Sequence, residues 1–378
     1  MEFEDRDAFE AWLKGQSQEI CVAIATRAAL RVWPVLWADR SWQDTEKARA
    51  AQEKFVLLTG WCNLISGAVS TYPTPEIKTA AATAATKAAI ASADGLGSRT
   101  AALLDAADAG RAAANAAARA TPADAVSAAT YTAATAAAAT AAAATAAAAA
   151  AAADAATYAD CGRTVEAMFA APLWHEAGPP EGLRPEALGP SRLDRDPRFD
   201  FFRRWYDGMT KGLPMDWDLQ SRVALIPETV WKAGADEVAE AIAQIEALFA
   251  VRQALGDLAQ ERAAAHVEGR HGIGGNNPPE EIDAVAEVRA SQTIIWAAVE
   301  EIAEEVEAKE PDKTRVARAL EAIKAAFLVC AKWAGKKADL AIDTAIKDGI
   351  GVAIKSGAAL YGLGQLIQAV EAWLPFLK

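Results

Sequence analysis

The sequence is poor in the residues from which most catalytic and metal sites are built. It has three histidines and four cysteines in 378 residues. The cysteines, at positions 21, 62, 161 and 330, form no C-x-x-C pair, so neither a zinc knuckle nor a disulfide framework is indicated. The histidines, at positions 175, 266 and 271, have no partner at metal-ligand spacing. We therefore expect no catalytic residue, no cofactor-binding residue and no metal site, and we do not expect an enzyme.

The chain also has fewer basic residues than acidic ones. The chain has 38 Lys and Arg against 51 Asp and Glu, which gives a net charge of −13. Surfaces that bind nucleic acids need clustered basic residues to displace counterions, so we expect no nucleic-acid partner. The N-terminus carries Glu2, Glu4 and Asp5 where a secretory signal would carry basic residues. We expect a cytoplasmic protein.

Long apolar runs are missing as well, and 349–370 comes nearest to a membrane-spanning segment. It is long enough but has Lys355 near its middle, where a charge costs at least about 2.5 kcal/mol on insertion. Its glycines permit close helix contacts, and the aromatic residues after it resemble interfacial anchors. We favour a helix buried in a soluble bundle and keep membrane contact as the alternative. The candidate membrane-contacting residues are Ile350, Val352, Ile354, Leu360, Leu363, Leu366, Trp373 and Phe376.

Alanine is the residue that the chain has in excess. Alanine and threonine dominate residues 79–160, with expected turns at Gly95, Gly97, Gly110 and Pro122. Alanine has the highest helix propensity, which predicts helices here. Each buried methyl contributes roughly 0.8 kcal/mol at best, so such a surface adheres weakly to its neighbours. We expect these helices to pack against partner helices and keep a solvent-exposed spacer as the alternative.

Aromatic residues and prolines concentrate in residues 161–219. Phe201, Phe202, Trp205 and Tyr206 share one helical face by their spacing. Aromatic residues are enriched at interfaces, which makes these four the candidate partner-binding residues. The other interpretation, which we favour, is a small aromatic core.

The last third of the chain shows amphipathic helical periodicity. Val288, Ile295, Val299 and Ile302 form one apolar stripe. A second amphipathic pattern starts after Pro311, because Pro and Asp are both tolerated in a first helical turn. The short connection predicts an antiparallel helical hairpin. The glutamates opposite the first stripe are expected to form a solvated face.

Between the amphipathic patterns lies 270–280, which reads Arg-His-Gly-Ile-Gly-Gly-Asn-Asn-Pro-Pro-Glu. It lacks the order of a phosphate-binding loop and follows a helix where such loops follow a strand, so we expect a linker. The H-G-I-G-x-N-N-P-P-E pattern, together with residues 202–207 and 217–227, resembles an uncharacterised family of alanine-rich helical bacterial proteins. The resemblance covers mainly residues 195–280 and implies no activity and no site residues.

These patterns predict an all-α protein with an elongated Ala-rich N-terminal half, a small aromatic junction and a C-terminal helical bundle. The expected division is an Ala-rich domain at 1–160, an aromatic junction and amphipathic helix at 161–269, a linker at 270–280 and a bundle at 281–378. We expect a non-enzymatic interaction or scaffolding protein that binds a protein partner or itself. The alternative is a membrane-acting effector whose segment 349–377 inserts in or lies on a bilayer.

Overall fold

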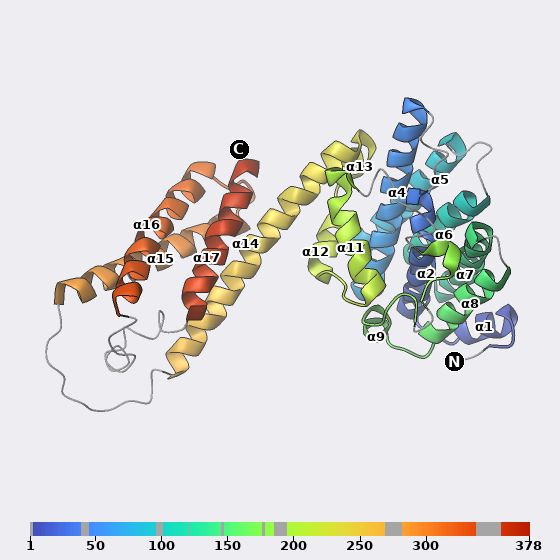
Figure 1. Cartoon of the computed structure of the whole chain (residues 1–378), viewed down its shortest axis with the longest axis horizontal. Helices are drawn as coiled ribbons and strands as arrows, with labels where there is room; N and C mark the ends of the chain where they lie inside the picture. Colours follow the sequence, from blue (N-terminus) through green and yellow to red (C-terminus); the bar gives the residue numbers. More distant parts are fainter. Residues whose placement is uncertain are drawn as a thin grey trace. The chain divides into compact units, whose positions relative to one another are not determined.

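The computed structural model describes residues 3–38, 45–95, 101–119, 121–144, 147–175, 178–184, 195–268, 282–337 and 357–378 (Figure 1). These residues contain helices and no β-strand, which confirms the all-α prediction. They form two compact units, Met1–Ile242 and Ala243–Lys378. Residues 161–242, which the sequence placed in a separate junction, therefore belong to the same unit as the Ala-rich helices.

The N-terminal unit is a helical assembly built around α2. Its helices are α1 (Arg6–Leu13), α2 (Gln18–Val32), α3 (Pro34–Ala38), α4 (Glu46–Thr71), α5 (Pro75–Gly95), α6 (Ala101–Ala118), α7 (Pro122–Ala144), α8 (Ala147–Asp160), α9 (Val165–Phe169), η2 (Glu181–Leu183), η4 (Pro197–Phe199), α11 (Asp200–Lys211), α12 (Trp217–Ala224), α13 (Glu228–Ala233) and α14 (Ala235–Glu268), which continues into the C-terminal unit. Helix α2 contacts α3, α4, α6, α7, α8 and α9. Every residue from 21 to 33 is buried, so α2 has no solvent-facing side in this stretch.

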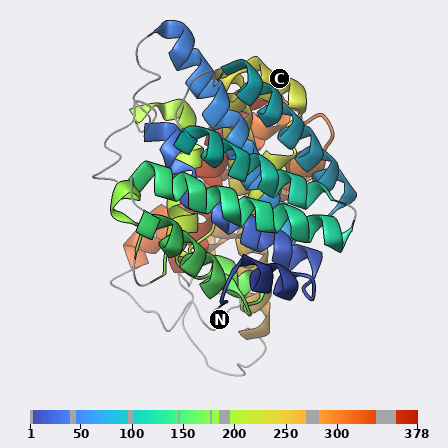
Figure 2. The ribbon, with the colours of Figure 1, turned by 90° about the vertical axis from the view of Figure 1, so that its right-hand side faces the viewer.

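The alanine-rich helices pack closely against one another and against α2. Figure 2 shows them in cyan and green, lying side by side in front of the blue helices. The small side chains allow α6 and α7 to pack closely against each other. Gly110, where the sequence predicts a turn, instead lies inside α6 and faces Asn63 of α4. Thr135 and Thr140 are buried in α7 and donate to carbonyls of their own helix, which satisfies their hydroxyl groups. The alanine-rich helices therefore pack against partner helices and do not form a solvent-exposed spacer.

The C-terminal unit is a bundle of α14 from Ala243 onward, α15 (Ile282–Glu307), α16 (Lys313–Lys337), α17 (Gly357–Trp373) and η5 (Leu374–Phe376). Its core includes the predicted stripe of Val288, Ile295, Val299 and Ile302. Asp312 caps α16 by accepting from the Thr314 backbone N–H at 2.7 Å, which is the predicted helix start. Helices α15 and α16 form the predicted hairpin.

Glu305 fixes the turn of this hairpin, and its replacement by alanine is expected to lower the free energy of unfolding by about 2 kcal/mol. The side chain is buried and accepts from the Asp312 backbone N–H at 2.6 Å, and it pairs with Arg315 at 2.5 Å. Glu304 pairs with Arg315 at 3.3 Å but is 71% exposed, so Glu304→Ala is a matched control expected to cost less than about 1 kcal/mol. Hydrogen exchange of α15 and α16 amides measures both; equal costs would contradict the role of Glu305.

Candidate functional site

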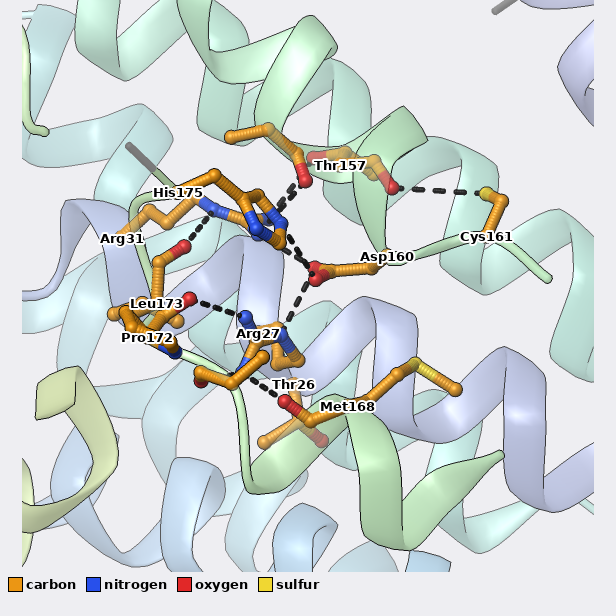
Figure 3. A network of polar contacts seen from close by, with 12 residues as sticks. Thr26, Arg27, Arg31, Thr157, Asp160, Cys161, Met168, Pro172, Leu173 and His175 are labelled. Carbon is orange, nitrogen blue, oxygen red and sulfur yellow. Dashed lines mark hydrogen bonds and ion pairs between the residues drawn. The ribbon is translucent and has the colours of Figure 1, made fainter. Parts of the chain in front are cut away.

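The main buried polar cluster of the described residues lies in the N-terminal unit, between α2, the end of α8 and the segment after α9 (Figure 3). Helix α2 supplies Arg27 and Arg31, whose four-residue spacing puts them on one face. Asp160 at the C-terminal end of α8 lies between them, and His175 also contacts its carboxylate. Both arginine side chains and Asp160 are almost fully excluded from solvent.

Asp160 is the shared acceptor of this cluster. Arg31 donates from Nη2 to Oδ2 at 2.5 Å, and His175 Nε2 lies 3.2 Å from Oδ1. Arg27 Nε lies 2.9 Å from Oδ2, an ion-pair distance, without the alignment of a hydrogen bond. Burial raises the pKa of Asp160, but the charge of Arg31, the hydrogen bond from His175 and the charge of Arg27 outweigh it. The pKa of this carboxyl is therefore held well below its ordinary value.

The remaining arginine donors bind backbone carbonyls. Arg27 donates to the carbonyl oxygens of Met168 at 2.5 Å, Ala171 at 3.0 Å and Pro172 at 2.8 Å. Arg31 donates to the carbonyl oxygen of Leu173 at 3.0 Å. The segment 168–173 is thereby tied to α2, and we call this stretch the strap.

Arg31 also binds the end of α8, where it donates to the Thr157 hydroxyl at 3.1 Å and to the Ala156 carbonyl oxygen at 3.0 Å. Cys161 follows Asp160 and donates to the Thr157 carbonyl oxygen at 3.6 Å. Burial raises the pKa of the Cys161 thiol to about 12, which keeps it protonated and unreactive at neutral pH.

The cluster contains residue types found in active sites, but its polar groups are engaged with one another and with the backbone. Its arrangement is that of a structural clamp between α2, α8 and the strap.

The four candidate partner-binding aromatic residues lie on α11, and three of them are buried. Phe201 is 4% exposed, Phe202 1% and Trp205 0%. Trp33, which lies between α2 and α3, packs against Phe202, Trp205 and Tyr206, with ring centroids 5.6–6.1 Å apart. Trp205 also donates to Gln220 Oε1 at 2.8 Å. These side chains form part of an aromatic core, as the favoured interpretation predicts. Little of their surface is exposed for contact with a partner.

The candidate membrane-contacting residues divide into two sets. Ile350, Val352 and Ile354 lie outside the described residues, as does the side chain of Leu360. Leu363, Leu366 and Trp373 are buried in the core of the C-terminal unit, and Phe376 packs against that core. Contact of this second set with lipid would require them to leave the core. The linker 270–280 also lies outside the described residues.

A surface groove of about 460 Å³ lies elsewhere in the N-terminal unit, between α5 and the connection from α12 to α13. Trp61 lines it, and Leu225 at its edge is 43% exposed. The other residues that line it are Pro75, Glu76, Thr79, Ala80, Thr83, Ile226, Pro227 and Glu228. This volume is within the range of ligand sites. The sequence did not reveal the groove, because its walls, 75–83 and 225–228, lie far apart in the chain.

A hydrogen bond, a stacked pair of rings and an ion pair hold the groove in shape. Trp61 donates to the Ala224 carbonyl oxygen at 2.9 Å and stacks on Trp231 with centroids 4.8 Å apart. Lys87 of α5 pairs with Glu228 of α13 at 2.8 Å. Both walls are therefore positioned without a bound partner.

The comparisons with known proteins add no further constraint. No protein-family model, no curated protein and no solved structure matches this chain. Among the described residues, no group of three or more His, Cys, Asp and Glu side chains is placed to hold a metal ion. The family resemblance of the 271–280 pattern stays a prediction.

Proposed function

We propose that the protein is a non-enzymatic helical interaction protein, and that the groove between α5 and the α12–α13 connection binds a protein segment with a basic residue beside an apolar one. The observation that supports this most directly is an apolar groove, already held in shape, with an acidic edge. Pro75, Pro227 and Leu225 provide its apolar surface. Burial of an apolar side chain there would supply affinity, because it removes apolar area from water.

The two glutamates of the groove differ in their availability. Glu228 is engaged by Lys87 at 2.8 Å and by Lys232 at 2.6 Å. Glu76, in the first turn of α5, is exposed and has no ion pair or hydrogen bond with another side chain among the described residues. An incoming Lys or Arg would therefore pair with Glu76, which adds specificity and salt dependence to the apolar contact.

This proposal is tested with peptides selected from a random twelve-residue library on the full chain. We expect the selected peptides to carry Lys or Arg next to Leu or Phe. Glu76→Gln is expected to weaken binding about two- to fivefold, as for an exposed ion pair. Leu225→Glu is expected to weaken it more than about tenfold, because it places a charge on the apolar contact. Fluorescence anisotropy of labelled peptides at two salt concentrations measures both effects.

Two matched variants serve as controls. Glu46→Gln changes another exposed first-turn glutamate, in α4, and Leu213→Glu changes a leucine that is 71% exposed and lies outside the groove. Neither control is expected to change the dissociation constant. Peptides that bind the groove variants and the controls alike would show that the groove is not the binding site.

A further inference from the structure

The groove between α5 and the α12–α13 connection follows one face of α5, and this face has opposite charges at its two ends. The residues of α5 that line the groove share that face by their spacing: Glu76, Thr79, Ala80 and Thr83. Lys87 lies four residues beyond Thr83 and therefore continues the same face by one turn. Glu76 and Lys87 are eleven residues apart in α5, so the two ends of this face lie about 16 Å from each other.

The positive end of the groove is formed by Lys87 of α5 and Lys232 of α13. Their Nζ atoms lie 2.8 Å and 2.6 Å from the same oxygen, Oε1 of Glu228, which lines the groove. Two positive charges thus meet one negative charge, which leaves an excess of one positive charge at this end. Each ammonium group has three N–H donors, so both lysines have donors beyond the one that binds Glu228. Their side chains are 26% and 55% exposed, which makes them accessible to a ligand.

The negative end is Glu76, and uncharged surface separates it from the lysines. Glu76 is exposed and has no ion pair or hydrogen bond with another side chain among the residues that the structure describes. On α5 the lining residues between Glu76 and Lys87 are threonine and alanine, and the opposite wall contributes Ile226 and Pro227. A ligand in the groove would therefore meet a carboxylate, then apolar surface, then a pair of ammonium groups.

We propose that the segment bound in this groove carries an acidic side chain about four to six residues from its basic one, and that the acidic side chain binds Lys87 and Lys232. An extended chain advances about 3.3 Å per residue, so a distance of about 16 Å corresponds to about five residues. The basic residue pairs with Glu76 at the other end, as the proposed function requires. This inference rests on that proposed function and adds to it a second charge of opposite sign and a fixed spacing.

The excess positive charge also gives the groove a means of selection. A segment with basic residues along its whole length would place one of them beside Lys87 and Lys232, where like charges repel each other. Specificity arises from such repulsion as well as from attraction. We therefore expect the groove to prefer a segment with both signs of charge over a purely basic segment, although the chain as a whole is acidic.

The experiment uses the full chain and the tightest peptide obtained from the twelve-residue library. We expect that peptide to have Asp or Glu four to six residues from its Lys or Arg. The variant Lys232→Glu leaves one positive charge beside two negative ones and is expected to weaken binding about tenfold, because it replaces an exposed ion pair with a repulsion. Changing the acidic residue of the peptide to lysine is expected to weaken binding to the unaltered chain to a similar extent. Combining the two changes is expected to restore most of the affinity.

Lys211→Glu is the matched control for this charge reversal. Lys211 is 62% exposed and pairs with Asp207 four residues earlier in α11, at 2.8 Å, and it lies outside the groove. The control is expected to leave the dissociation constants of both peptides unchanged. A second control peptide has its acidic residue moved next to the basic one, and Lys232→Glu is expected to change its affinity less than about twofold.

The outcomes separate this inference from the proposed function on which it rests. The inference is overturned if the selected peptides lack an acidic residue at this distance, if combining the two changes restores no affinity, or if Lys211→Glu weakens binding as much as Lys232→Glu. In each of these cases the proposed function stands, provided that Leu225→Glu still weakens binding. If Leu225→Glu has no effect, the groove is not the binding site and both proposals fail.

Discussion

Replacing Asp160 with asparagine is expected to lower the free energy of unfolding of the N-terminal unit by about 3–5 kcal/mol at pH 7. The carboxylate is the shared anionic partner of Arg27 and Arg31, and all three groups are buried. Asparagine has nearly the same shape but no charge, so two guanidinium groups would remain buried without their counter-charge. Urea unfolding followed by circular dichroism, with hydrogen exchange of α2 and α8 amides, measures the loss.

Asp154→Asn is the matched control for this prediction. Asp154 also lies in α8, but its ion pair with Arg6 is 3.5 Å long and the arginine is 48% exposed. A partly exposed pair contributes less than about 1 kcal/mol. A loss at Asp160 no larger than the loss at Asp154 would show that the buried cluster does not hold the unit together.

The effect of Asp160 is also expected to depend on pH. Its pKa is lowered in the folded protein relative to the ordinary 3.8, so folding favours the ionised carboxylate. The stabilisation is complete above the pKa of the unfolded chain and is lost as the pH falls below about 4 towards the folded pKa. The difference in stability between the unaltered chain and Asp160→Asn should therefore shrink in acid. A difference that stays constant between pH 7 and pH 3 would contradict this electrostatic origin.

The sequence predicts the helices better than it predicts their partners. The apolar stripes of α15 and α16 and the stop at Pro311 follow from local spacing, and the structure has the helices there. No such stripe can be recognised in the alanine segment, because an alanine side chain is compatible with both a buried and an exposed face of a helix. Its packing depends on the neighbouring helices, which local periodicity does not reveal. Gly110 likewise resembles a turn in sequence but lies inside α6, where an added Cβ would make an ordinary contact with Asn63 of α4.

The Asp160 clamp could be predicted only in part. Two arginines four residues apart in the otherwise apolar stretch of α2 are a signal of a buried charged partner, because unpaired charges are rarely buried. The sequence does not identify that partner, since Asp160 lies 129 residues beyond Arg31 and the other acceptors are backbone carbonyls. The aromatic residues of α11 illustrate the same limit, because their burial depends on Trp33, far away in the chain.

The strap also packs against the C-terminal end of α11, where it contacts Gly212. Gly212 has a φ of 71°, in the left-handed region, and caps α11. A Cβ atom there would lie 2.7 Å from the carbonyl oxygen of Ala170 and 2.7 Å from the carbonyl carbon of Ala171. The Ala171 carbonyl is bound by Arg27, and the Leu173 N–H donates to the Thr210 carbonyl oxygen at 2.9 Å. The strap therefore has little room to move away from a larger side chain.

Gly212→Ala is accordingly expected to lower the free energy of unfolding of the N-terminal unit by about 3 kcal/mol, the sum of left-handed backbone strain and overpacking. Gly178→Ala is the matched control, because Gly178 has a φ of 67° but no atom within 4 Å of its added Cβ. That variant carries the backbone strain alone, about 1 kcal/mol. Urea unfolding of both variants measures the difference, and equal losses would show that the strap yields to the methyl group. A larger loss at Gly212, together with faster hydrogen exchange at the Leu173 amide, would show that both α11 and the arginines of α2 hold the strap.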